Sequence, residues 1–143
     1  MTNIGGGIFA DCKKLSAIDM AEGNTAYVSV EGVLYNKAMT TLVQYPAGKD
    51  NDSYTIPESV TTVGDYAFCG NDYLTSLPLH DKLKVISDFA FARVSGVPTF
   101  DVPASTESIG ESAFHDCWSL TDINVPRAIP TTHRWTACST TRR

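Results

Sequence analysis

The sequence contains no apolar run of about 18 residues, the length needed to cross a membrane as a helix. Its first residues, MTNIGGGIFADC, also lack the charged segment and long apolar stretch of a secretory signal. Such a chain either stays in the cytoplasm or begins after its export signal has been removed. We expect the second, and a fragment of a longer protein, because the chain starts inside a repeat unit.

Basic residues are scarce, with 11 Lys and Arg against 16 Asp and Glu. This balance argues against nucleic acid or an anionic membrane as the partner. The segment from Arg127 to the end contains four arginines and no acidic residue. The rest of the chain therefore has an acidic surface, with a small basic tail.

What the sequence does contain is a frame that recurs at one fixed spacing, the step from Phe68 to Phe91 and again to Phe114. The frame has four apolar positions, and the Ala before each Phe recurs as well. The members of the frame are Val63, Ile86 and Ile109; Phe68, Phe91 and Phe114; Leu74, Val97 and Leu120; and Leu77, Phe100 and Ile123. A period of roughly this length indicates a solenoid, in which each repeat buries its apolar side chains against its neighbours. We expect the three phenylalanines to form an interior ladder.

Each repeat is predicted to be α/β. It reads as a strand ending in Pro, a short second strand, a helical arc through the Ala-Phe pair, and an LxxIx strand. Gly64 and Gly110 fit the turn into the arc, but Ser87 takes that position in the middle repeat, so a positive φ is not strictly required there.

The predicted solenoid covers residues 1–126. Residues 4–20 form a first repeat around Phe9, which lies more than two periods before Phe68, and residues 55–126 form the later repeats. Residues 21–54 form a β-hairpin island, with YVSVEGVLYN turning at Glu31-Gly32 and residues 47–52 as an exposed loop. Residues 127–143 form a terminal cap, with Ile129 and Trp135 covering the last repeat, or a disordered tail.

Four cysteines are present, namely Cys12, Cys69, Cys117 and Cys138. Cys12 and Cys117 each stand three residues after a frame phenylalanine, a position expected to face the interior. Such positions in distant repeats lie too far apart for a disulfide, which needs Cα atoms about 4.4 to 6.8 Å apart. We expect buried free thiols, which do not indicate the redox compartment.

The segments IPESVTTVGDYAFCGNDYLTSL and VPASTESIGESAFHDCWSLTDINVP resemble the repeat of the BspA-like leucine-rich repeat family. The island VEGVLYNKAMTTLVQYPAGK is similar to an insert common in that family. Together these similarities cover residues 4–126. The departures are Ile8 for Ala, Ser87 for Gly, His80 for Pro, and Val94 and Asn71 for Cys.

This resemblance implies a leucine-rich-repeat solenoid, a short right-handed β/α superhelix with a parallel sheet on one face. It also implies an extracellular or cell-surface protein that binds other proteins, as an adhesin-like scaffold without enzymatic activity or cofactor. Two alternatives stay open: a structural spacer or stalk with no specific ligand, and a carbohydrate-active solenoid enzyme. We also expect self-association through poorly covered ends of the solenoid.

The candidate binding surface is the exposed face of the LxxIx strands, because residues flanking an inward side chain point outward. Its members are Asp19, Ser76, Thr99, Asp101, Asp122 and Asn124. This column is small, polar and mildly acidic, and it lacks the Tyr, Trp and Arg that anchor tight interfaces. An ordinary solvated sheet face therefore competes with a binding site.

Catalytic and metal-binding patterns in the sequence are weak. His115 and Cys117 are too close in sequence to form a nucleophile pair, since catalytic dyads join residues that are distant along the chain. A zinc site from His115, Cys117, His133 and Cys138 lacks the usual spacing. The segment KDND is the nearest approach to a calcium loop but lacks its pattern. Asp101 and Asp122 lie on neighbouring repeats without the consistent partners that a glycosidase needs.

Overall fold

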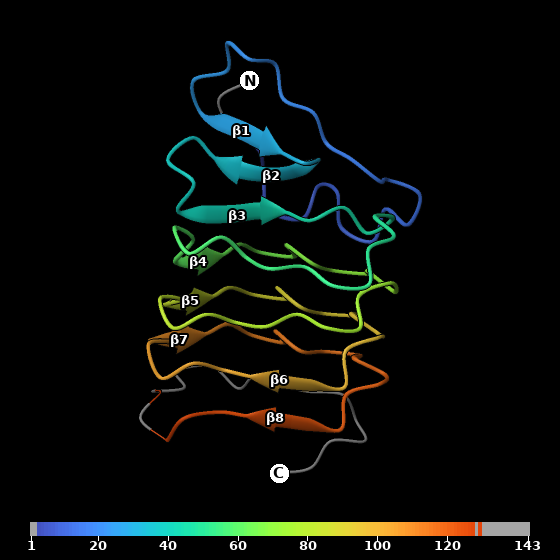
Figure 1. The fold of residues 1–143 in the computed structure, drawn as a ribbon, viewed down its shortest axis with the longest axis vertical. Helices are drawn as coiled ribbons and strands as arrows, with labels where there is room; N and C mark the ends of the chain where they lie inside the picture. The colour runs from blue at the N-terminus through green and yellow to red at the C-terminus, as the bar shows by residue number, and fades with distance from the viewer. Residues whose placement is uncertain (1–2, 128, 130–143) are drawn as a thin grey trace.

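The structure is a computed structural model that describes residues 3–127 and 129. Its described part contains eight short strands in two sheets, one of six strands in the order β1-β2-β3-β4-β5-β7 and one of two strands, β6 and β8 (Figure 1). The strands are β1 (Tyr27–Val30), β2 (Val33–Asn36), β3 (Thr41–Gln44), β4 (Thr62–Val63), β5 (Val85–Ile86), β6 (Thr99–Asp101), β7 (Ser108–Ile109) and β8 (Asp122–Asn124).

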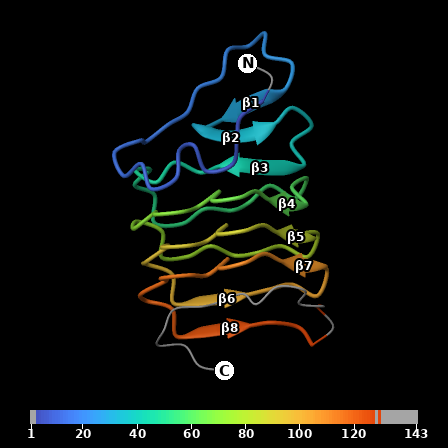
Figure 2. The same ribbon diagram turned by 180° about the vertical axis from the view of Figure 1, so that it is seen from behind.

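The hairpin expected at Glu31-Gly32 is present. β1 and β2 pair antiparallel, with Val30 opposite Val33, and the two turn residues have φ of 51° and 81°. Two left-handed residues match the twist of a two-residue hairpin, and glycine adopts that conformation without strain. β2 then pairs antiparallel with β3, so the hairpin extends the sheet of the repeats. Figures 1 and 2 show it at one end of the stack.

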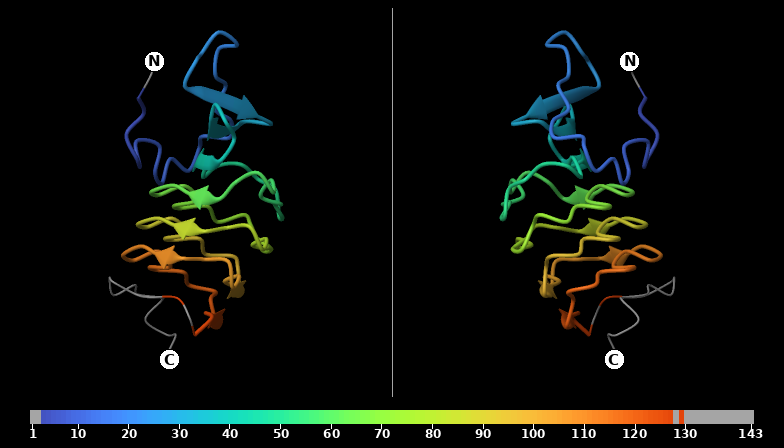
Figure 3. Two further views of the ribbon diagram at one scale, coloured as in Figure 1. Left: turned by 90° about the vertical axis from the view of Figure 1, so that its left-hand side faces the viewer. Right: turned by 90° about the vertical axis from the view of Figure 1, so that its right-hand side faces the viewer.

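The repeats stack in parallel with the spacing that the sequence predicts. Thr62 pairs with Val85 and Val85 with Ser108 in the large sheet, each one full period further along the chain. In the small sheet Phe100 pairs with Ile123 at the same spacing. The two sheets lie on different sides of the stack (Figure 3), and the last two repeats each contribute one short strand to each side, β5 with β6 and β7 with β8.

The predicted helical arcs are wrong, because no helix occurs within residues 3–127. The Ala-Phe segments form turns in which Tyr66, Phe89 and Ser112 take left-handed φ between 53° and 59°. A left-handed residue in each turn prevents continuous helix. The backbone also bonds between repeats: the Phe68 amide donates to the Ala90 carbonyl and the Phe91 amide to the Ala113 carbonyl, both at 2.8 Å.

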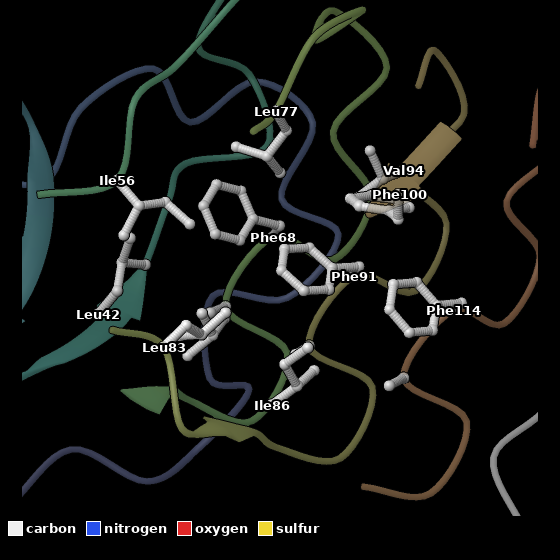
Figure 4. Packing of buried hydrophobic residues seen from close by; sticks show 14 of the residues in the cluster. Leu42, Ile56, Phe68, Leu77, Leu83, Ile86, Phe91, Val94, Phe100 and Phe114 are labelled. Carbon is white, nitrogen blue, oxygen red and sulfur yellow. The ribbon is translucent and has the colours of Figure 1, made fainter. Parts of the chain in front are cut away.

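The interior ladder of phenylalanines is confirmed (Figure 4). Phe91 stacks on Phe68 with ring centroids 5.3 Å apart and on Phe114 at 5.5 Å, and all three rings are fully buried. Tyr45 adds a further rung, since it stacks on Phe68 at 5.1 Å and stands one period before it. The sequence did not reveal this rung because the island interrupts the other frame positions.

Residues 4–20 follow the turn geometry of the later repeats without completing the ladder. Gly7 and Asp11 are left-handed, four residues apart like Tyr66 and Gly70, and the Asp11 amide donates to the Cys69 carbonyl at 3.3 Å. Phe9, however, is only half-buried. It packs in a separate apolar cluster on the face of the hairpin sheet turned away from the ladder, with Ile4, Ile18 and Leu34.

Two expectations for exposure need correction. Cys12 is exposed, because the N-terminal repeat lies outside the ladder, whereas Cys69 and Cys117 are buried. Within residues 47–52 only Asp50, Asn51 and Asp52 are exposed. Ala47 is buried at the start of that segment.

The predicted cap or tail at residues 127–143 falls almost wholly outside the described residues, as do Trp135 and Cys138. Arg127 is exposed. Ile129 is buried and packs against the main core, and its amide donates to the Pro126 carbonyl at 3.4 Å.

Candidate interaction surface

β6 and β8 bring four of the six predicted surface residues together. Thr99 lies opposite Asp122 and Asp101 opposite Asn124, and all four are exposed. Between them Phe100 points into the core and is fully buried. The Asn124 side-chain amide donates to an oxygen of Asp101 at 2.5 Å. Strand alternation thus produces an exposed polar patch, which we call the strand face.

Ser76 continues the strand face but belongs to a separate ladder. It forms a parallel bridge with Ser53, and the Tyr54 amide donates to its carbonyl at 3.3 Å. In the described part of the chain no backbone hydrogen bond joins residues 76–78 to β6. Proline lacks the amide hydrogen that such a ladder needs. Pro78 stands one period before Asp101 of β6, and Pro98 directly precedes Thr99. These two prolines therefore interrupt the sheet here.

Asp19 is exposed but lies far from the other predicted surface residues. Its neighbours bond to the hairpin: the Ile18 amide donates to the Gly32 carbonyl and the Met20 amide to the Ser29 hydroxyl, both at 2.9 Å. The hairpin lies at the opposite end of the stack from β6 and β8 (Figure 1). The N-terminal repeat therefore does not extend the strand face.

A second surface, which sequence reasoning missed, follows the turns between the two sheets. Tyr66 and Phe89 are half-buried and stack with centroids 4.9 Å apart and planes 2° from parallel. The rings of His115 and Phe89 meet edge to face, with centroids 6.5 Å apart. The signal was available, since Tyr66 and Phe89 both stand two residues before a ladder phenylalanine.

The turns also carry the large exposed aromatic residues of the repeats. Tyr73 and Trp118 are 48% and 63% exposed. Tyr, Trp and Arg are the types that most often anchor protein interfaces. In this protein such residues lie at the turns, whereas the strand face is polar.

Ion pairs connect the N-terminal repeat to these turns. Asp11 contacts Arg93 at 2.8 Å, and Lys13 contacts Asp72 at 2.6 Å. The Ser95 hydroxyl donates to Asp72, also at 2.6 Å. Partial burial works against the charged form of Asp72, but the hydrogen bonds from Lys13 and Ser95 outweigh it, so the pKa of this carboxyl is lowered.

The geometry does not assemble a nucleophile from His115 and Cys117. The Cys117 thiol is buried and donates to the Phe91 carbonyl at 3.1 Å, while His115 faces Asp116 at 3.3 Å. Among the described residues, no group of three or more His, Cys, Asp or Glu side chains is placed to hold a metal ion. His133 and Cys138, considered above for zinc, lie outside that part of the chain.

None of the residues that the structure describes belongs to a helix with the length and apolar character needed to span a membrane.

Comparison with known proteins points to one family. Residues 47–140 match the BspA type leucine rich repeat region, in six copies. A leucine-rich repeat protein from Eubacterium ventriosum is similar at 30% sequence identity and a TM-score of 0.91, over 97% of this chain and 37% of that chain. The pneumococcal vaccine antigen PcpA is similar at 32% identity and a TM-score of 0.71, over 76% of this chain and 29% of that chain.

A leucine rich cell surface protein from Faecalibacterium prausnitzii shares the fold at 20% identity and a TM-score of 0.53, over 93% of this chain and 46% of that chain. The chain thus spans less than half the length of these three proteins. No match was found among proteins of curated function.

Proposed function

The chain belongs to the BspA-type leucine-rich repeat family, and from that premise we propose that it is a non-enzymatic scaffold that binds another protein. The observation that carries the proposal is the strand face, where Thr99, Asp101, Asp122 and Asn124 stand exposed over a buried core. Repeat proteins use such stacked strands as extended binding surfaces. The fold alone would not suffice, because one fold hosts many functions.

The repeats, we further propose, form part of a longer solenoid in an exported, adhesin-like protein of the cell surface. Support comes from the similar Faecalibacterium protein, which is described as a leucine rich cell surface protein. The partner we envisage is a host or bacterial surface protein.

A structural spacer is the second candidate function. The composition of the strand face favours a spacer, because its exposed residues are small or acidic and none is aromatic. A spacer would bind no protein at this face, whereas a scaffold would.

Binding of purified extracellular-matrix and bacterial surface proteins to the immobilised chain tests the two candidates. We expect at least one protein to bind saturably, to lose binding to the double variant Thr99→Arg, Asn124→Arg, and to keep it to the matched control Thr25→Arg, Asn3→Arg. Thr25 and Asn3 are exposed residues away from the strand face. Equal binding to both variants, or none to the wild type, would refute the strand face as a binding site. Turnover of a polysaccharide would refute the non-enzymatic assignment.

A further inference from the structure

A polar pocket lies where the hairpin turn and the loop after β3 meet the segment of Ser53, which pairs with Ser76 of the next repeat. Its volume is about 310 Å³, and it is lined by Glu31, Lys49, Asn51, Ser53, Tyr54 and Thr55. Glu31 belongs to the hairpin turn and Lys49 and Asn51 to the loop after β3, so the residues that interrupt the repeat build most of its wall. Insertions on a repeated scaffold are common places for binding sites.

Hydrogen bonds from Asn71 and Lys49 hold the walls of the pocket in place. The buried Asn71 side-chain amide donates to the carbonyls of Pro46, Ala47 and Lys49 at 3.2 to 3.4 Å. The Lys49 ammonium donates to the Glu31 carbonyl at 3.0 Å, which ties the loop to the hairpin turn. A pocket fixed before its ligand arrives loses little entropy on binding.

The pocket offers neutral donors and acceptors around an aromatic wall. Asn51, Ser53 and Thr55 can each donate and accept, and their side chains make no hydrogen bond to the described residues. The negative charge of the Glu31 carboxylate and the positive charge of the Lys49 ammonium cancel, so the lining has no net charge. Tyr54 closes the inner side, where its hydroxyl bonds to that of Tyr35 and its ring lies 4.8 Å from Tyr45.

We propose that this pocket binds a single neutral pyranose unit of a glycan. Ring hydroxyls need several convergent donors and acceptors, and the apolar face of a pyranose packs on an aromatic ring. Within the lining of the pocket, a charged ligand would find no net opposite charge. The volume stands at the lower end of the range for ligand pockets, about 300 to 1,000 Å³, which suits one sugar unit.

The pocket lies beside Ser76, which stands one repeat before β6. Ser53 pairs with Ser76, so the polar column that continues along the stack begins at the pocket wall. A glycan bound here would extend over that column. The sugar site goes beyond protein binding and does not depend on it, since free sugars test it directly.

The experiment is a titration of the isotope-labelled chain with neutral methyl glycosides, followed by the backbone NMR signals. We expect at least one glycoside to shift the signals of Glu31 and residues 49–55 saturably. The double variant Asn51→Ala, Thr55→Val removes two hydrogen-bonding groups and should weaken that glycoside at least about tenfold. The matched control Asn3→Ala, Thr25→Val makes the same changes elsewhere and should leave the affinity unchanged.

Titration with N-acetyl-lysinamide and N-acetyl-glutamate provides the other arm. Shifts of the same signals by these compounds, without any from a glycoside, would overturn the proposal and assign the pocket to a side chain of a protein. Absence of shifts by all ligands at their solubility limit would overturn it as well. Unchanged glycoside affinity in the pocket variant would place the sugar elsewhere.

Discussion

The carboxylate of Asp11 accepts a hydrogen bond from the Arg93 guanidinium at 2.8 Å, although the two residues are 82 positions apart in sequence. Gly70, left-handed like Asp11, lies between them in the stack, and its amide donates to the Ala92 carbonyl at 3.0 Å. Because Gly70 has no side chain, Asp11 reaches across a whole repeat. The N-terminal repeat is thereby fastened to two later repeats at once.

Replacing Gly70 with Ala should break this arrangement. The new Cβ would overlap the Asp11 carboxylate and stand 2.8 Å from the Asp11 Cα, at a φ of 85°. We expect a loss of about 1 to 3 kcal/mol in the free energy of unfolding, measured by urea denaturation. Gly23→Ala is the control, since nothing lies within 4 Å of its Cβ position. A Gly70 variant as stable as the control would contradict the close stacking.

Phe91→Ala should cost about 3 to 5 kcal/mol in stability, because it leaves a cavity between two stacked rings. Phe91 is fully buried between Phe68 and Phe114. Phe89→Ala removes the same atoms from a half-buried ring and should cost clearly less. Chemical denaturation of both variants checks the order. A loss under about 1 kcal/mol for Phe91→Ala would mean that the ladder does not carry the core.

The repeat spacing and the ladder could be predicted because periodic apolar residues report directly on burial. The turns found in place of the expected helical arcs could not be predicted, because Ala-Phe segments have the same composition in a helix and in a stacked turn. What decides between them is the left-handed φ at Tyr66, Phe89 and Ser112. These three residue types do not require that conformation, so no sequence signal marks it.

The strand face was predictable where strand alternation applies, at Thr99, Asp101, Asp122 and Asn124. Asp19 was misplaced because the island lies between its repeat and the others, and sequence spacing does not reveal which side of the sheet a segment covers. The pocket was missed for a related reason. Its walls come from Glu31 and from residues of the segment 49–55, which are brought together by the hydrogen bond from Lys49 to Glu31 and by those of Asn71.

The exposed thiol of Cys12 should react with iodoacetamide much faster than those of Cys69 and Cys117 in the folded protein. Thiolate is the reactive form, and burial raises the pKa of the Cys69 thiol, with the charge of Asp11 adding to the effect. Cys117 is fully buried. Mass spectrometry of peptides after brief alkylation measures each site, and alkylation in urea is the control. Equal labelling of Cys12 and Cys69 would contradict the exposure found for the N-terminal repeat.

Association through the end of the stack should depend on concentration. β8 pairs only with β6 in the described part of the chain, and Ile123, Val125 and Pro126 line an open hollow of about 480 Å³ beside it. Unpaired strand edges promote pairing between chains, and an added Lys opposes it. We expect sedimentation to show self-association that Val125→Lys weakens and Tyr73→Lys, on the exposed turns, does not. A strict monomer at high concentration would refute this.

Asp72 should make stability depend on pH in the acid range. The ordinary pKa of an Asp side chain is 3.8, and the pKa of Asp72 in the folded protein is lower, because the bonds from Lys13 and Ser95 outweigh the opposing effect of burial. A lowered folded pKa contributes stability above pH 3.8 that is lost as pH falls through the folded value. Asp72→Asn should therefore reduce the urea midpoint at neutral pH and flatten its decline in acid. Asp81→Asn, at an exposed residue, is the control, and an equal decline in both variants would show that the ion pair with Lys13 does not stabilise the fold.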